Sequence, residues 1–165
     1  MFKIGLGQDS HKLIAKSNKQ EAISKKNLIL GGVEISREYF LIADSDGDVI
    51  IHALCNALSS AIGEGSLDTW AGAMFKSGIT DSKEFLQVIV TKIKQLGFSI
   101  NNISIAIEAK KPRLESFREQ MQKSLAKLIE LKKEDIGITF TSGESLTAFG
   151  KGEAIQAFTT VLLSK

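Results

Sequence analysis

The sequence of 165 residues is poor in cysteine, proline and histidine. Its one cysteine, Cys55, excludes an internal disulfide and any metal site built from several thiolates. With only two histidines, a transition-metal site must combine these imidazoles with carboxylates. The one proline, Pro112, means that no proline-rich linker divides the chain, so turns must be made by glycine, asparagine and aspartate.

The chain also lacks a strong net charge and any long apolar run. Its 21 basic and 19 acidic side chains are interleaved and give a net charge of +2, which argues against an obligate partner made of nucleic acid. No segment approaches the roughly 18 apolar residues of a membrane span, and the first residues lack the apolar region of a signal peptide. We therefore expect a cytoplasmic protein without a membrane partner, folded as one domain over residues 1–165.

Period-two alternation predicts the strands. Phe2, Ile4 and Leu6 alternate with small or polar residues, and this strand is expected to end in a polar turn at residues 8–10. The Gly31-Gly32 pair predicts the turn of a hairpin over residues 27–35. Further strands are expected at residues 103–107 and 136–140. The lysine-rich stretch 12–26 is interpreted as a solvated loop, with a rim that attracts phosphate as the alternative.

Helical spacing and capping residues predict the helices. They are expected over residues 48–62, over residues 82–96, from Pro112 onward and from about Gly152 onward. Residues 63–80 are expected to be irregular, with room for a short helix at 67–74. The predicted fold is therefore an α+β domain of about four strands in one mixed sheet, with its helices on one face.

One candidate site combines both histidines. Asp48, His52 and Asn56 form a polar row beside the apolar stripe of the helix at 48–62. Asp9 and His11 are two residues apart in a strand, so their side chains point to the same side. Together with His52 they offer two nitrogens and a carboxylate, which suit zinc with a fourth position left open. Histidines that are only hydrogen-bonded parts of the scaffold remain the alternative.

Two further segments carry groups that bind phosphate. Thr141, Ser142 and Glu144 follow a strand, and Lys151 comes shortly afterwards between two glycines. Hydroxyls bind phosphate oxygens and a carboxylate can hold Mg²⁺, although a plain capped helix start would look the same. Residues 108–114 bring three cations to an expected helix N-terminus, which attracts phosphate, and a solvated turn is equally compatible.

Taken in order, these segments resemble the 2-C-methyl-D-erythritol 2,4-cyclodiphosphate synthase family of the non-mevalonate isoprenoid pathway. The resemblance covers nearly the whole chain and rests on several motifs in the family's order. These are the opening strand with Asp9-x-His11, the hairpin Leu30-Gly31-Gly32-Val33, Ser45-Asp46-Gly47-Asp48 followed by His52, the helix cap Asp81-Ser82, the turn Pro112-Arg113-Leu114, and the closing signature from Glu144 to Glu153.

The resemblance implies a homotrimer with active sites between neighbouring subunits. It implies a nucleotide-diphosphate substrate, 4-diphosphocytidyl-2-C-methyl-D-erythritol 2-phosphate, which is cyclised with release of CMP. It also implies Zn²⁺ on Asp9, His11 and His52, and Mg²⁺ or Mn²⁺ on Glu144 and the substrate phosphates. Asp44, Ser142 and Glu144 would be catalytic. The substrate would be bound by Asp9, His11, Asp44, Ser45, Ala109, Pro112, Arg113, Leu114, Thr141, Ser142, Glu144 and Lys151.

Several positions depart from the family pattern. Asp44 stands where a histidine is usual, which places an anion near an expected phosphate, and Ser66 removes a carboxylate that normally holds the ribose. Glu64 or Asp68 could replace that carboxylate. Ser142 replaces a threonine and Lys151 replaces an arginine that could bind in a bidentate way. Two alternatives therefore stay open: a trimeric homologue that binds cytidine diphosphate and metal with lost or reduced turnover, and a metal-dependent phosphohydrolase on the same scaffold.

Overall fold

A five-stranded mixed sheet forms the centre of this computed structural model, which describes residues 1–16 and 26–165. The strands are β1 (Phe2–Ala15), β2 (Leu28–Leu30), β3 (Val33–Ser36), β4 (Tyr39–Leu41), β5 (Ser99–Glu108), β6 (Ile136–Thr141) and β7 (Ala154–Ser164). The main sheet has the order β4-β1-β7-β5-β6, and β2 pairs with β3 in a separate hairpin. Strands β5 and β6 are parallel, and the other neighbours are antiparallel.

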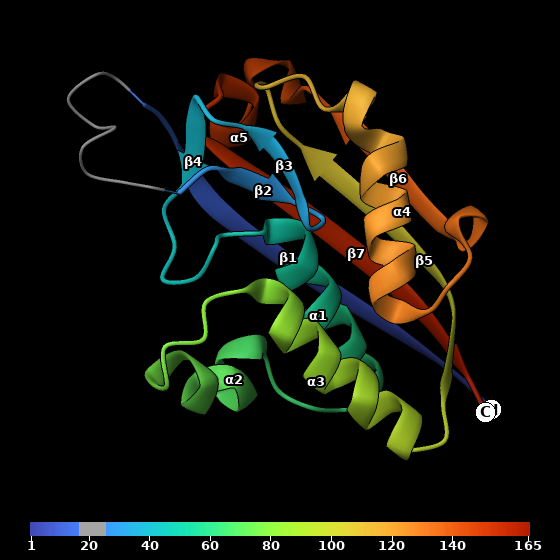
Figure 1. Cartoon of the computed structure of the whole chain (residues 1–165). Helices are drawn as coiled ribbons and strands as arrows, with labels where there is room; N and C mark the ends of the chain where they lie inside the picture. Colours follow the sequence, from blue (N-terminus) through green and yellow to red (C-terminus); the bar gives the residue numbers. More distant parts are fainter. Residues whose placement is uncertain (17–25) are drawn as a thin grey trace.

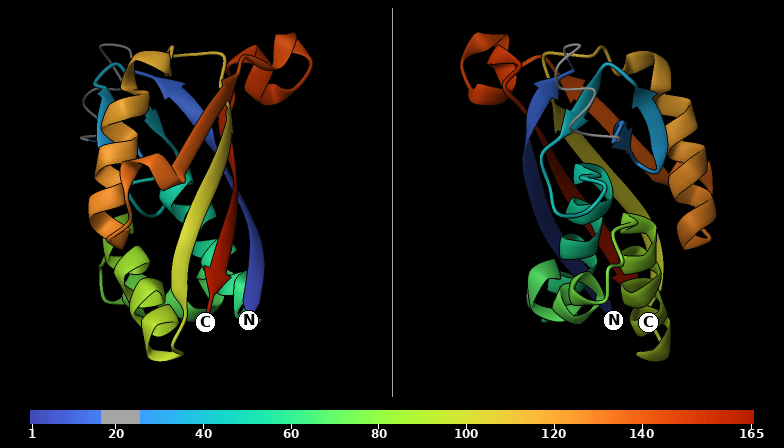
Figure 2. Two further views of the ribbon diagram at one scale, coloured as in Figure 1. Left: turned by 90° about the vertical axis from the view of Figure 1, so that its right-hand side faces the viewer. Right: turned by 60° about the vertical axis from the view of Figure 1, so that its left-hand side comes forward.

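The four longer helices cover one face of this sheet, as predicted, and a fifth, short helix lies away from them at one end of the sheet (Figures 1 and 2). They are α1 (Val49–Ala61), α2 (Leu67–Lys76), α3 (Ser82–Gln95), α4 (Arg118–Ile129) and the short α5 (Ala148–Lys151), with single 3₁₀ turns η1 (Glu115–Phe117), η2 (Lys133–Asp135) and η3 (Gly143–Ser145). None of the helices in the described ranges is both long and apolar enough to cross a membrane. Apart from the short α5 at the end of the sheet, the opposite face carries no helix in these ranges, as the left view of Figure 2 shows.

Two predictions about the sheet are wrong. The first strand does not end at residues 8–10, because its pairing with β7 continues to Lys12 and its pairing with β4 continues to Ala15. Asp9 and His11 consequently lie within the strand. The final helix expected from Gly152 is instead strand β7, and the sheet therefore has more strands than the four expected.

The error at β7 has a clear physical reason. Ile155, Phe158, Val161 and Leu162 have helical spacing, but Ile155, Ala157, Thr159, Val161 and Leu163 also alternate, and these are the buried residues. The strand lies between β1 and β5 and is hydrogen-bonded on both sides. Long-range pairing with two neighbours overrides local helical periodicity, since it satisfies the backbone on both edges while one face is buried.

The remaining element predictions agree more closely with the structure. Helices α1 and α3 and the hairpin of β2 and β3 are confirmed, and Gly31 and Gly32 have positive φ in its turn. The helix predicted from Pro112 begins later, at η1, and continues as α4. The short helix allowed for at residues 67–74 within the segment 63–80 is confirmed as α2. Of the expected loop at 12–26, residues 12–15 belong to β1, and residues 17–25 lie outside the described part of the chain.

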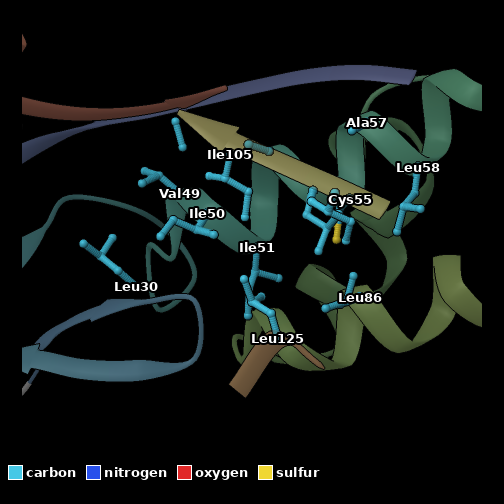
Figure 3. Packing of buried hydrophobic residues seen from close by; sticks show 14 of the residues in the cluster. Leu30, Val49, Ile50, Ile51, Cys55, Ala57, Leu58, Leu86, Ile105 and Leu125 are labelled. Carbon is cyan, nitrogen blue, oxygen red and sulfur yellow. The ribbon is translucent and has the colours of Figure 1, made fainter. Parts of the chain in front are cut away.

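Helix α1 forms the centre of the core (Figure 3). Its inner residues pack between the sheet, α3 and the hairpin, and the buried side chains around it include Leu30, Leu86, Ile105 and Leu125. Cys55 is fully buried in this cluster, and burial raises the pKa of its thiol. The thiol therefore acts as a small apolar side chain rather than as a nucleophile.

Two glycines allow β1 to lie directly against α1. A Cβ atom on Gly5 would lie 1.9 Å from the carbonyl oxygen of Ala57, and one on Gly7 would lie 2.1 Å from that of Ala53. Both clashes are with helix backbone, which has no rotamer to change. Any larger residue at these positions must therefore move the strand away from the helix.

Asp48 connects the start of α1 to the hairpin. Its carboxylate accepts hydrogen bonds from the backbone N–H groups of Ile50 and Ile51, both at 3.1 Å, and so caps the helix. It also accepts from Gly31 N–H at 2.9 Å and Gly32 N–H at 2.7 Å. One buried side chain thus satisfies donors from two elements that are distant in sequence.

We predict that Gly7→Ala destabilises the protein and that Gly72→Ala does not. A methyl group at Gly7 must displace β1 from α1, and overpacking of this kind should lower the free energy of unfolding by about 2–3 kcal/mol. Gly72 lies in α2, and no atom lies within 4 Å of the place that a methyl group would take, so alanine there should leave stability unchanged or raise it by up to about 1 kcal/mol. Chemical denaturation measures both, and a Gly7→Ala protein as stable as wild type would contradict the close-contact interpretation.

Candidate functional site

Asp9, His11 and His52 meet where β1 crosses α1. Each contributes one ligand atom, and these three atoms lie within 4.8 Å of one another. Asp9 Oδ2 lies 3.0 Å from Nδ1 of His52 and 3.1 Å from Nε2 of His11. The two imidazole rings are nearly perpendicular, with their centroids 5.7 Å apart. The sequence prediction that both histidines share one site with Asp9 is therefore consistent with the geometry.

The local fold explains this convergence. Asp9 and His11 alternate with outward-facing residues along β1, so both point toward the helical face of the sheet. His52 lies one turn beyond the helix cap Asp48, on the side of α1 that faces the strand. Gly5 and Gly7 bring the two elements close enough for the side chains to meet.

The electrostatics of the cluster favour a bound cation. Burial acts to raise the pKa of Asp9, but the neighbouring His11 and His52 lower it by more, so the carboxyl stays ionised. Burial acts to lower the pKa of His52, but the hydrogen bond and charge of Asp9 give a net increase. The ionised Asp9 and the raised pKa of His52 therefore make the point between these two side chains favourable for a positive charge, which a metal ion could supply in place of a proton.

The donor set also fits a divalent transition metal. Nε2 of His11 is buried and has no well-aligned hydrogen-bond partner among the described residues, although it faces Asp9. A buried nitrogen without a partner is unfavourable unless a ligand completes it. Two imidazoles and one carboxylate are typical zinc ligands, and three protein ligands leave a coordination position for substrate.

A cavity of about 300 Å³ opens beside this cluster. Five predicted site residues line it: Asp9, His11, Asp44, Ser45 and His52. Its remaining lining residues are Ala43, Asn56, Ser66, Leu67, Asp68 and Phe75. Most of these come from α2 or the residues just before it, a region in which the sequence shows no clear periodicity.

Asn56 holds the start of α2 beside this cavity. Its side-chain amide donates to the carbonyl of Gln8 on β1 at 3.2 Å, and its carbonyl oxygen accepts from Leu67 N–H at 2.8 Å. Helix α2 is therefore tied to the strand that carries Asp9 and His11. Asp68 then lies on the cavity wall, whereas Glu64 forms an ion pair with Lys92 at 2.8 Å. Of the two carboxylates considered as replacements at Ser66, Asp68 is the one that lines this cavity.

A second cavity, of about 480 Å³, lies at the carboxyl ends of β5 and β6. It brings together six predicted site residues: Ala109, Arg113, Leu114, Thr141, Ser142 and Glu144. Lys110, Glu115 and Phe140 also line it. The parallel pairing of β5 with β6 places these two sequence segments side by side, which periodicity alone does not reveal.

The loop that carries Glu144 has an unusual backbone. Glu144 and the residue after it both have positive φ, at 48° and 63°. Ser142 donates to the Glu144 carboxylate at 3.3 Å, so the two predicted functional side chains are in contact. Gly143 packs so closely against Glu108 that a Cβ atom would lie 2.1 Å from its carboxylate oxygen. This tight turn directs an exposed carboxylate into the second cavity.

The predicted site residues do not all lie in one cavity of the chain. Pro112 and Lys151 do not line either of these two cavities, and the two cavities have no lining residue in common. Glu144, which is predicted as a ligand of the second metal, lies in the second cavity and apart from the Asp9 cluster. Within one chain, the predicted residues therefore form two separate half-sites.

Comparisons with known proteins agree with this geometry. The model of the YgbB family matches residues 2–164. A Chlamydia trachomatis protein named 2-C-methyl-D-erythritol 2,4-cyclodiphosphate synthase is 38% identical over 159 residues, which cover 96% of this chain and 85% of that protein. The structural relatives include proteins that carry the same enzyme name.

One solved structure, named 2C-Methyl-D-erythritol-2,4-cyclodiphosphate Synthase, has a TM-score of 0.85 at 29% identity, and the match covers 98% of this chain and all of that one. A Plasmodium falciparum structure, described as IspF in a CDP complex, has a TM-score of 0.82 at 25% identity, with 98% of this chain and 95% of that chain covered. Sequence, fold and site geometry thus lead to one conclusion: the chain belongs to the YgbB family, together with relatives named as 2-C-methyl-D-erythritol 2,4-cyclodiphosphate synthases.

Proposed function

We propose that this protein is a metal-dependent enzyme that converts 4-diphosphocytidyl-2-C-methyl-D-erythritol 2-phosphate to 2-C-methyl-D-erythritol 2,4-cyclodiphosphate and CMP. The observation that carries the proposal is the convergence of Asp9, His11 and His52 at the wall of a cavity. The names of the relatives support the same reaction. The CDP of the related Plasmodium falciparum complex contains the cytidine and diphosphate of this substrate.

In the proposed reaction an oxygen of the 2-phosphate forms a bond to the β-phosphorus of the diphosphate. The bond from that phosphorus to the oxygen shared with the α-phosphate breaks, and this oxygen leaves with CMP. Water is neither consumed nor released. Phosphoryl transfer of this kind depends mainly on positioning and on stabilising negative charge, so the protein must hold two phosphates against each other.

The first cavity would hold the phosphates that react. Asp9, His11 and His52 would bind Zn²⁺, which when bound acts as a Lewis acid on a phosphate oxygen. Asp44 and Ser45 line the same cavity and would contact the substrate there, through their backbone N–H groups as well as the Ser45 hydroxyl. The Lys26 ammonium donates to the carbonyl oxygens of Ala43 and Ser45, at 2.6 and 2.7 Å. This cation partly offsets the extra negative charge of Asp44.

The second cavity would hold the cytidine and the leaving phosphate. Ala109, Arg113 and Leu114 line this cavity and would receive the cytosine ring, largely through backbone groups, with Pro112 shaping the turn beside them. Glu144 would hold Mg²⁺ or Mn²⁺, which when bound would stabilise negative charge on the phosphates, a role that suits an exposed carboxylate at the cavity wall. The Thr141 and Ser142 hydroxyls would bind phosphate oxygens in this cavity. The Lys151 ammonium, which does not line the cavity, would bind phosphate oxygens from outside it.

A homotrimer would explain why one chain carries two separate half-sites. Strands β1 and β6 are three strand spacings apart in the sheet, which is roughly 14 Å. Metal ions that act on one phosphoryl group lie only about 3.5–4 Å apart. The Zn²⁺ half-site of one subunit would therefore act with the Glu144 half-site of a neighbour.

The uncovered face of the sheet supports this assembly. Phe2, Ile4 and Leu6 point outward from β1 and are 73%, 75% and 59% exposed, and Phe158 of β7 is 45% exposed beside them. A contiguous exposed apolar patch is typical of a protein interface. We propose that this face packs against the same face of other copies of the chain.

The activity prediction concerns Glu144. Glu144→Gln removes the negative charge that would hold the second metal, so the rate of CMP release should fall about 100-fold or more. Glu84→Gln on the exposed side of α3 is a matched control and should keep wild-type activity. Chromatography of CMP formed from the substrate, with zinc and magnesium present, measures both variants.

The same assay separates the alternatives. A folded trimer that binds CDP in calorimetry but releases no CMP would contradict the proposed reaction and favour the binding homologue. A linear product heavier than the cyclic one by one water, detected by mass spectrometry, would instead indicate a phosphohydrolase.

Zinc affinity should decrease as the pH is lowered. The pKa of His52 is raised, so in the metal-free protein this imidazole stays protonated to a higher pH than an ordinary one. Zinc must displace that proton, and its binding therefore weakens as the pH falls from about 8 to about 6. Calorimetry in two buffers of different ionisation enthalpy should detect up to about one proton released near neutral pH. Equal affinity across this range without proton release would contradict the assignment of His52 as a ligand.

The assembly prediction uses the outward face of β1. Ile4→Asp places a charge in the proposed interface and should convert the protein to a monomer, whereas wild type should sediment at three times the chain mass of 17.9 kDa. Val88→Asp is the control, because Val88 is an exposed apolar residue of α3 on the other side of the molecule. A monomeric wild type, or a trimeric Ile4→Asp variant, would contradict the proposed interface.

A further inference from the structure

The ring nitrogen of His52 that faces away from Asp9 has its own set of partners. Its Nε2 lies 2.8 Å from the Ser82 hydroxyl oxygen and 3.2 Å from that of Ser45. The Ser82 hydroxyl is also hydrogen-bonded to the Asp46 carboxylate. A chain of contacts thus runs from His52 through the first residue of α3 to the loop that precedes α1.

The carboxylate of Asp46 accepts several hydrogen bonds. Besides the Ser82 hydroxyl, its carboxylate accepts from the backbone N–H of Ser82 at 3.1 Å and from that of Asp48 at 3.2 Å. A serine hydroxyl has one proton to donate. Because Asp46 takes that proton, the Ser82 oxygen presents only lone pairs to His52.

The remaining hydrogen bonds then follow by elimination. If Nε2 carried a lone pair, it would face the lone pairs of the Ser82 oxygen at 2.8 Å, which is a repulsive contact. If Nε2 carries a proton, it donates a hydrogen bond to that oxygen. Ser45 is compatible with this direction, because its oxygen accepts from Gly47 N–H at 3.1 Å and lies farther from the ring. Nε2 therefore keeps a proton, and Nδ1 is the nitrogen that remains for a metal ion beside Asp9.

The side chains around Nε2 of His52 are buried, so water cannot easily replace their hydrogen bonds. Ser45, His52 and Ser82 are 1%, 6% and 0% exposed. Water has little access to Nε2, so the loss of the Ser82 hydroxyl would leave a buried donor without its main acceptor.

We propose that Ser82 and Asp46 are positioning residues for zinc: they hold the Nε2–H tautomer of His52 and so direct the Nδ1 lone pair at the ion. The inference rests on the proposed function only in assuming that the Asp9 cluster binds a metal. Hydrogen-bond partners of metal-bound histidines commonly contribute about 10–100-fold to metal affinity. Removal of the Ser82 hydroxyl should therefore lower the affinity for Zn²⁺ by about this factor.

The first test measures Zn²⁺ affinity of the folded wild-type chain and its variants by competition with a chelator. Ser82→Ala should bind Zn²⁺ about 10–100-fold more weakly than wild type. Ser82→Thr, which keeps the hydroxyl, should recover most of this loss. Ser59→Ala is the matched control: this serine of α1 is equally buried, but its hydroxyl donates to Gly65 at 2.5 Å and should leave zinc affinity unchanged.

The second test observes the protons of His52 directly. Nitrogen-15 NMR of the zinc-loaded wild-type protein should show a protonated Nε2 on His52, with a hydrogen-bonded proton that exchanges slowly with water, and a metal-bound Nδ1. In Ser82→Ala that proton should exchange faster while the amide protons of neighbouring core residues keep their wild-type exchange rates, which separates a local effect on His52 from a loss of stability.

The outcomes separate the two proposals. Zinc bound through Nε2, or wild-type zinc affinity in Ser82→Ala, would overturn the role of Ser82 and Asp46 while the proposed enzyme function remained. If the wild-type protein released CMP without binding zinc at this cluster, the positioning role would be overturned. If zinc bound with the predicted tautomer but no CMP formed, the function alone would fail.

Discussion

The close contact between β1 and α1 is the constraint on which the rest of the structure depends. Gly5 and Gly7 lie so near the helix carbonyls that no side chain fits between the two elements. The strand therefore runs across the helix at a fixed separation, and Asp9 and His11 come within reach of His52. Two glycines, which have no reactive side chain, thus determine where the candidate metal ligands of Asp9, His11 and His52 lie.

The three residues of the polar row on α1 have three different roles. Asp48 caps the helix and holds the hairpin, His52 supplies a ligand atom, and Asn56 ties β1 to α2. Each is spaced by about one helical turn, so all three project from the same side while the apolar stripe fills the core. The candidate site is consequently fixed by the same helix that organises the fold.

Much of this could be predicted from local sequence, and the failures have physical causes. The helix at α1 and the Asp9-x-His11 pair depend on short-range spacing, which a sequence displays directly, whereas the approach of His52 to that pair is a long-range contact that the scarcity of histidine and the family resemblance suggested. Strand β7 could not be predicted in this way, because its pairing with β1 and β5 is long-range. Glu144 could be recognised as a functional group, but its separation from the Asp9 cluster follows from the strand order, which no local pattern contains.

The central claim is that the β1–α1 contact assembles a zinc site from nearly all the ligand chemistry that this sequence offers. X-ray diffraction at the zinc absorption edge, from crystals of the protein grown with zinc and CDP, tests it most directly. We expect an anomalous peak within about 2.0–2.2 Å of Asp9 Oδ2 and of one ring nitrogen each of His11 and His52. Zinc located elsewhere, or the absence of a peak among these three side chains, would contradict the account.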